Sequence, residues 1–156
     1  MTDLILFFDG LCEPRNPGGI ATFGWLLLDE RGQVIQEGSG VEARGPSATN
    51  NVAEWSALEH GLRAAAALRP ERLLIHGDSK LAINQLTGEW RTHAAHLRPY
   101  RDRCRELLKG CDWQARWVPR EQNAAADALS RLAYERALCT LCTPCTPMIW
   151  EVKTNG

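Results

Sequence analysis

The sequence has no long hydrophobic run. Among its 156 residues, no apolar stretch approaches the roughly 18 residues that a membrane-spanning helix needs. The first residues, Met1, Thr2 and Asp3, lack the positive charge and small-residue cleavage site of a secretory signal. We therefore expect a cytoplasmic protein that makes no contact with a membrane. The hydrophobic share of 44% is enough for the core of one ordinary domain.

The sequence also lacks a Ser/His or Cys/His arrangement of the kind used in covalent catalysis. Three of the six cysteines are scattered along the chain, which suits reduced thiols in a cytosolic setting. The other three, Cys139, Cys142 and Cys145, recur every third residue. This spacing resembles half of a zinc site, but no second Cys or His pair follows it. An incidental Cys/Thr/Pro-rich tail, with or without one disulfide, is the alternative that we prefer.

Charge is distributed unevenly although the net charge is only −1. Residues 1–60 carry nine acidic residues against three arginines, and residues 91–120 carry eight basic residues against three acidic ones. An acidic cluster with a separate basic segment is typical of a metal site beside a track for a polyanion. The alternative is an ordinary solvated helix surface.

Hydrophobic periodicity and turn residues predict an α/β fold. Its mixed five-stranded sheet has three antiparallel strands followed by parallel ones, with helices on both faces. Expected strands are 4–9, 21–28, 33–43, 72–77 and 112–118; expected helices are 49–69, 80–87, 93–110 (interrupted or bent near Pro99) and 123–138.

We expect one monomeric domain over residues 1–138 and a C-terminal tail over residues 139–156 that can pack on it. Within the tail, Met148–Val152 fits either a short extra strand or an apolar plug over the sheet. The pattern is too short to choose between them.

Four acidic residues stand in strongly patterned surroundings. They are Asp9 at the end of the first apolar strand, Glu54 and Asp127 in the first turns of two expected helices, and Asp78 after the fourth strand. Glu54 falls on the apolar stripe of its helix, where a carboxylate is costly unless a positive group meets it. Asp78 could instead cap a helix, and Asp127 could complement a helix dipole. Two divalent cations would account for all four residues at once.

The motifs around these acids resemble those of ribonuclease H type I, in its compact, archaeal-type branch. The resemblance covers about residues 4–134. It rests on the segments 9–19 (DGLCEPRNPGG), 49–55 (TNNVAEW), 77–79 (GDS) and 117–123 (WVPREQN), together with Asp127.

The resemblance implies an endoribonuclease that hydrolyses the RNA strand of RNA–DNA hybrids and leaves 5′-phosphate and 3′-hydroxyl ends. Asp9, Glu54, Asp78 and Asp127 would hold two Mg²⁺ or Mn²⁺ ions, with Asp9 bridging them. Cleavage of RNA–RNA duplexes is an additional activity that the branch permits.

The resemblance also implies residues that bind the substrate. Asn16, Asn50 and Asn51 match positions that contact the minor groove of the hybrid, where RNA displays its 2′-hydroxyl groups. Thr49 matches a position that binds a phosphate of the DNA strand. Taken singly, Asn16 also fits a turn, and Thr49 or Asn50 a helix cap.

Three departures from the family pattern are visible. The loop before Asp127 has no histidine, and we assign Arg120 an auxiliary catalytic role in its place. The basic protrusion of some bacterial members is missing or reduced, and the tail has no counterpart. Two alternatives stay open: a hybrid-binding module without catalysis, and a ribonuclease H domain of a larger reverse-transcription or replication protein.

Overall fold

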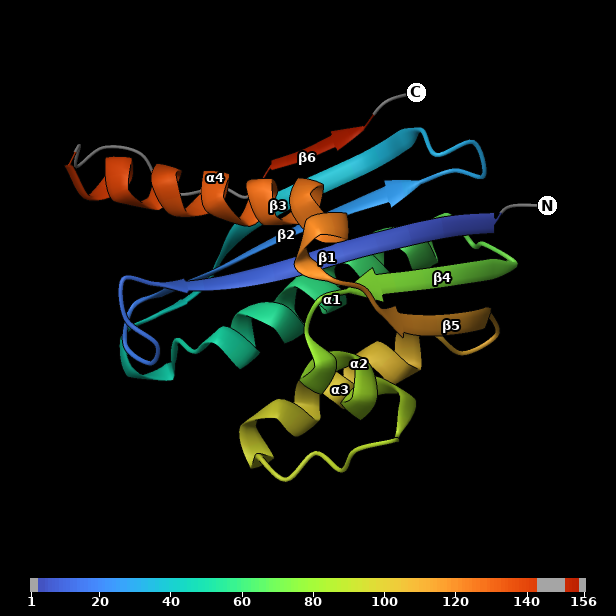
Figure 1. Ribbon diagram of the computed structural model, residues 1–156, viewed down its shortest axis with the longest axis horizontal. Coiled ribbons are helices and arrows are strands. Elements are labelled where there is room, and N and C mark those ends of the chain that lie inside the picture. The colour runs from blue at the N-terminus through green and yellow to red at the C-terminus, as the bar shows by residue number, and fades with distance from the viewer. Residues whose placement is uncertain (1–2, 143–150, 155–156) are drawn as a thin grey trace.

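An apolar run near the start of the chain forms the central strand of a mixed sheet in the computed structural model, which describes residues 3–142 and 151–154. The strands are β1 (Asp3–Glu13), β2 (Ile20–Leu28), β3 (Val34–Arg44), β4 (Arg72–Gly77), β5 (Asp112–Trp117) and β6 (Glu151–Thr154). Their order across the sheet is β5-β4-β1-β2-β3-β6. β1, β2, β3 and β6 pair antiparallel, whereas β4 and β5 are parallel to β1 (Figure 1).

Four α-helices cover the two faces of this sheet (Figure 1). They are α1 (Asn50–Ala67), α2 (Lys80–Thr87), α3 (Arg98–Leu107) and α4 (Ala124–Cys142), with short 3₁₀ turns η1 (Gly45–Ser47), η2 (Ala95–Leu97) and η3 (Arg120–Asn123). α1 packs close to Leu6 and Trp25, whereas α4 packs against Gly24, the neighbour of Trp25 whose Cβ would point to the opposite face. The main core therefore lies between the sheet and α1.

The fold class agrees with the expectation from sequence, and most element boundaries differ by only a few residues. Three details differ. β1 does not end at Asp9 but continues to Glu13, α4 continues past Leu138 to Cys142, and Pro99 lies in the first turn of α3 rather than in a bend within a helix. Proline is well tolerated in a first turn because its missing N–H has no partner there anyway.

The tail adds a sixth strand, because the main chain of β6 pairs with β3 from Glu151 to Thr154. The expected strand or plug at Met148–Val152 falls partly outside the described residues. The side chains of Cys142 and Cys145 also lie outside them. Within the described part of the chain, no helix is both long and apolar enough to cross a membrane.

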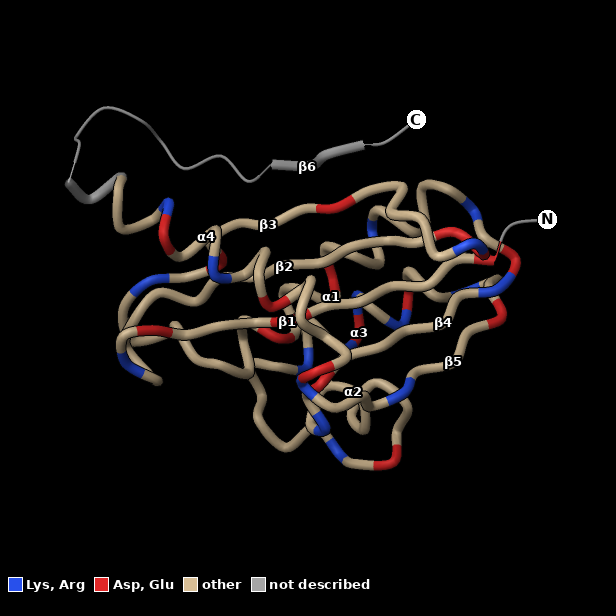
Figure 2. The backbone as a smooth tube through the Cα atoms, turned by 45° about the horizontal axis from the view of Figure 1, so that its top comes forward, with Lys and Arg blue, Asp and Glu red and all other residues tan. Residues whose placement is uncertain are grey.

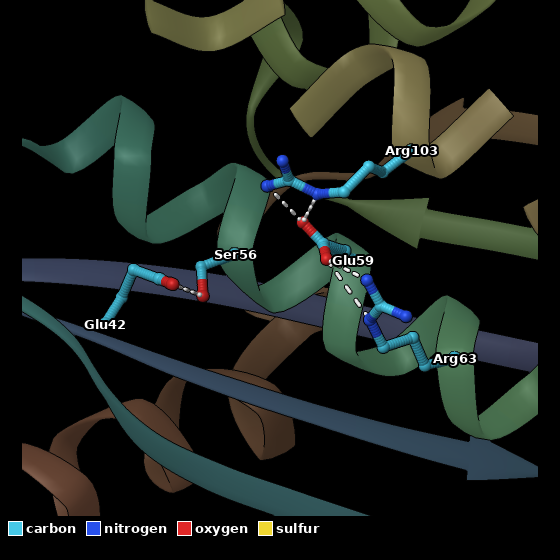
Figure 3. A network of polar contacts seen from close by, with 5 residues as sticks. All are labelled: Glu42, Ser56, Glu59, Arg63 and Arg103. Atoms are coloured by element: carbon cyan, nitrogen blue, oxygen red, sulfur yellow. Dashed lines mark hydrogen bonds and ion pairs between the residues drawn. The ribbon is translucent and has the colours of Figure 1, made fainter. Parts of the chain in front are cut away.

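A polar network fastens the basic helix α3 to α1 (Figure 3). The buried Glu59 accepts hydrogen bonds from Arg63, one turn further along α1, and from Arg103 of α3. The shortest nitrogen–oxygen distances are 2.6 Å to Arg63 and 2.8 Å to Arg103. Burial opposes the charge on Glu59, but the two arginines outweigh it and lower the pKa of this carboxyl below its usual 4.5.

We predict that Glu59→Gln lowers the free energy of unfolding by about 1–2 kcal/mol near pH 7, because both arginines are half-exposed and partly screened. A lowered pKa in the folded state stabilises the protein above pH 4.5, and this contribution is lost as the pH falls through the folded-state pKa. Urea unfolding of both proteins at several pH values should therefore show the difference shrinking below pH 4.5. Glu106→Gln, which removes the exposed pair with Lys109, serves as the control and should change stability little. A difference that stays constant with pH would contradict this account.

Candidate active site

Asp9 and Asp78 lie next to each other at the end of β4, because β1 continues beyond the point where β4 ends. The last pair between these parallel strands joins Phe8 to Gly77. Asp9 is therefore the first residue of β1 beyond the pairing with β4, and Asp78 is the first residue after β4. Asp9 is 5% exposed, and its Oδ1 accepts a hydrogen bond of 3.0 Å from the main-chain N–H of Gly10.

Gly10 brings the third acidic residue to this point. A Cβ added at Gly10 would lie only 2.3 Å from main-chain atoms of Ala53 and Glu54, so α1 could not approach β1 this closely over any other residue. Glu54 lies in the second turn of α1. The sequence predicts a place in the first turn, so this detail differs. Glu54 is 4% exposed, and its Oε2 is buried without a hydrogen-bond partner in the part of the chain that the structure describes.

Asp78 is half-buried and does not cap α2. The cap is Ser79, whose hydroxyl accepts a hydrogen bond from Ala82 N at 3.1 Å, so the Asp78 carboxylate keeps its acceptor capacity. The main-chain carbonyl of Asp78 accepts a hydrogen bond of 3.0 Å from the indole N–H of Trp117, at the end of β5.

One carboxylate oxygen from each of Asp9, Glu54 and Asp78 lies within 4.8 Å of the others. We call these three residues the carboxylate trio. Burial, followed by the nearby Asp78 charge, raises the pKa of Asp9 from 3.8 to about 8. Burial, followed by the Asp9 charge, raises the pKa of Glu54 well above its usual value. Such a buried cluster is electrostatically costly by itself, and its oxygen ligands suit a hard divalent cation.

Asp127 lies beside the trio in the first turn of α4. Its carboxylate makes an ion pair with Arg131 at 3.1 Å, and its hydrogen bonding with Asp9 contributes to the raised pKa of Asp9. The loop before α4 is tied to β1 by the buried Asn123, whose side-chain N–H donates to the Phe8 carbonyl at 2.8 Å. Asp127 is thus held close to Asp9 through the strand that carries Asp9.

The predicted substrate residues lie at the start of α1. Thr49 caps the helix by accepting a hydrogen bond from Val52 N, and the exposed Asn16 accepts one from Asn50 N at 3.0 Å. Asn51 is half-buried. Arg120 is exposed at the start of η3, and within the described residues it makes no hydrogen bond or ion pair with the four acids.

Two residues that support the site did not stand out in the sequence as site residues. In the sequence both belong only to the segment 117–123, which assigns no contact to either of them. Each donates a hydrogen bond to a main-chain carbonyl far away in the sequence: Trp117 to Asp78, just after β4, and Asn123 to Phe8 within β1. Spacing along the chain gives no direct signal of such contacts.

The arrangement of strands, helices and acids agrees with a match to a known family. A family model described as "Reverse transcriptase-like" matches residues 7–133, well over half of the chain. The chain belongs to this family. Its membership and its structural neighbours confirm the predicted resemblance to ribonuclease H type I and the predicted fold class.

Three comparisons show which members of the family this chain resembles. A curated protein of Halobacterium salinarum named Ribonuclease HI is 43% identical over 132 residues, which make up 84% of this chain and 64% of that protein. The crystal structure of RNase H1 from this archaeon has 41% identity and a TM-score of 0.78, covering 86% of this chain and 98% of that one. A compost-derived RNase H1 solved with an RNA/DNA hybrid has 26% identity and a TM-score of 0.77, covering 86% and 99%.

The chain is shorter than these curated relatives. It spans 64% of the length of the halobacterial protein and 33% of the length of a bifunctional protein of Mycobacterium tuberculosis, to which it is 31% identical. The shared region in both cases includes most of the present chain.

We predict that Asp9→Asn stabilises the protein in the presence of EDTA. Asparagine keeps the Oδ1 acceptor for Gly10 N but removes a carboxyl whose pKa rises from 3.8 to about 8 on folding, so that folding at pH 7 no longer has to protonate this group. Urea unfolding at pH 7 should show a gain of about 1–3 kcal/mol. The exposed Glu121→Gln is the control and should be close to neutral. A loss of stability in Asp9→Asn would show that the trio is not under electrostatic strain.

Proposed function

We propose that the chain is an endoribonuclease that hydrolyses the RNA strand of RNA–DNA hybrids. The observation that carries the proposal is the carboxylate trio. Its oxygens are closely spaced, Asp9 and Glu54 are buried, and one oxygen of Glu54 has no hydrogen-bond partner among the described residues. Two comparisons support it: one similar protein is named Ribonuclease HI, and another RNase H1 was solved with an RNA/DNA hybrid.

Asp9, Glu54 and Asp78 are the residues that would hold divalent cations, and Asp127 would complete the set from α4. Their hard oxygen donors fit Mg²⁺ or Mn²⁺, and the four acids would together hold two such ions. Asp9 interacts with each of the other three acids and is therefore the residue that both ions would share. When bound, such a pair supplies the positive charge that activates a water nucleophile and stabilises the leaving 3′ oxygen. The products would carry 5′-phosphate and 3′-hydroxyl ends.

The protein scaffold contributes the positions of these carboxylates. Asp9 is fixed inside β1, Glu54 is fixed by the close packing of α1 on Gly10, and Asp127 is held by Arg131. The site therefore needs little rearrangement of its main chain before it binds ions. Arg120 retains its proposed auxiliary role as an exposed cation on the loop that leads to Asp127.

Recognition of the RNA strand would occur at the start of α1. Asn16 uses its side-chain oxygen to accept from Asn50 N, which leaves its NH₂ group available as a donor to the substrate. Asn50 and Asn51 offer further donors and acceptors for 2′-hydroxyl groups and base edges. Thr49 would bind a phosphate of the DNA strand through its hydroxyl proton, while its oxygen continues to cap α1.

A second contact surface would be the arginine-rich side of α3. Figure 2 shows Lys and Arg residues along the segment that contains α2 and α3. Arg91, Arg98, Arg101 and Arg105 line one common hollow there. Arg98 and Arg105 also donate to main-chain carbonyls of the connecting segment and of α2, so their side chains are held in place. An ordered group of arginines is well suited to nucleic-acid phosphates.

A monomer would be sufficient for this reaction, because all four acids come from one chain. RNA–RNA duplexes are an additional proposed substrate, since contacts to 2′-hydroxyl groups and phosphates also exist on an RNA duplex.

The test is a cleavage assay with end-labelled RNA–DNA hybrid, RNA–RNA duplex and single-stranded RNA, each with Mg²⁺, Mn²⁺ or EDTA. We expect metal-dependent cutting of the hybrid and none in EDTA. Asp78→Asn and Asp127→Asn should each lower kcat by at least about 100-fold, because losing a metal ligand exceeds the usual effect of losing an outer-shell partner. Asp112→Asn, at the far end of β5, should retain the wild-type rate.

Folded protein that binds the hybrid but cuts no substrate with either metal would contradict the enzymatic proposal. It would indicate the alternative of a binding module without catalysis. Circular dichroism of each variant distinguishes loss of activity from loss of fold.

A further inference from the structure

Trp117 stands where the pairing between β4 and β5 ends. The last main-chain hydrogen bond in this region runs from Val118 N to Gly77 O at 2.9 Å. The indole N–H of Trp117 then donates to the next carbonyl, that of Asp78, at 3.0 Å. A side chain thus adds one hydrogen bond beyond the end of the strand, at a residue of the carboxylate trio.

Asp78 needs such support more than the other members of the trio. Asp9 lies within a paired strand and Glu54 within a helix, whereas Asp78 lies in the short connection between β4 and α2. Sites that bind ions depend on ligand positions held to a fraction of an ångström. The Trp117 indole is the side chain that restrains the main chain of Asp78.

The same ring also holds a cation. The ammonium group of Lys80 lies 4.7 Å from the centroid of the Trp117 ring, a geometry typical of a cation–π contact. Lys80 is exposed and follows Asp78 by two residues. Within the described part of the chain it makes no ion pair with an acid, so its N–H donors remain open to an incoming anion.

Trp117 itself is accessible to solvent. It is 45% exposed although it ends a strand of the central sheet, and a packing role alone would favour a more buried ring. The ring and the Lys80 ammonium group on it are therefore open to solvent directly beside Asp78 of the trio.

We propose that Trp117 is a positioning residue with two roles: its indole N–H fixes the main chain of the metal ligand Asp78, and its ring holds Lys80 to contact a substrate phosphate next to the one that is cleaved. This inference rests on the proposed function, because it assumes that the trio binds metal and that the substrate is a nucleic acid. The two roles are separable, since one uses the indole N–H and the other uses the face of the ring.

The first role is tested by Mn²⁺ binding, measured by isothermal titration calorimetry without substrate. Trp117→Phe keeps a ring but removes the donor, and we expect its Kd for Mn²⁺ to rise about tenfold, at the low end of outer-shell effects. Replacing Trp117 by β-(3-benzothienyl)alanine, which has sulfur in place of the N–H, should give the same rise with the ring size unchanged. Trp90→Phe, at a tryptophan that is similarly exposed (49%), is the matched control and should leave the Kd unchanged.

The second role is tested by the salt dependence of hybrid binding. Lys80→Met should reduce the slope of log KM against log salt concentration by about one, the value expected for one lost phosphate contact. Lys80→Arg should restore the slope, and kcat should change little in either variant. Lys109→Met, at an exposed lysine paired with Glu106, is the control and should behave as the wild type.

The outcomes separate the inference from the proposed function. If the wild-type protein binds neither Mn²⁺ nor the hybrid, both are overturned. If the wild type binds both and the Trp117 variants have the wild-type Kd for Mn²⁺, the positioning role is wrong while the proposed function stands. An unchanged salt slope in Lys80→Met would likewise overturn the phosphate contact alone.

Discussion

The close contact between α1 and β1 is the constraint on which the site depends. At Gly10 the helix main chain comes so near the strand that no side chain fits between them. This contact brings a helix residue, Glu54, to a position beside a strand residue, Asp9. Because β4 ends one residue before Asp78, the third carboxylate arrives at the same place from the parallel side of the sheet. The trio is thus assembled by the contact of α1 with Gly10 and by the difference in length between β1 and β4.

The assembled site opposes the stability of the fold that carries it. Burial and mutual repulsion raise the pKa of Asp9 and Glu54, so the metal-free protein holds these groups at an energetic cost. The rest of the domain compensates through ordinary means, including a large apolar core and the Glu59 network between α1 and α3. Bound cations would relieve the cost at its source, so folding and ion binding are expected to be thermodynamically coupled.

The sequence was sufficient to predict the fold class and the succession of strands and helices along the chain, because both depend on local patterns, and the same patterns made the four acids the candidate site residues. Apolar runs end in acidic residues, and helix boundaries are marked by Ser79, Gly88 and Pro70. It was less informative about the extent of β1, since the residues after Asp9 resemble a loop and are held in the sheet by pairing with β2. It could not identify the supporting roles of Trp117 and Asn123, because each depends on a main-chain carbonyl far away in the chain, that of Asp78 or of Phe8.

The pairing of β6 with β3 has a consequence for how the molecule meets its neighbours. A bare edge strand offers a row of unused main-chain donors and acceptors that can recruit a second chain and begin aggregation. Here the last described strand occupies part of that row, opposite Gln36 to Ser39. β6 then becomes the outer strand on that side, and it is only four residues long. The other edge, β5, is short and carries exposed charges at Asp112 and Arg116, with Pro119 soon after it ends. Short edge strands are poor templates for intermolecular pairing, so the C-terminal segment replaces part of a long edge with a short one.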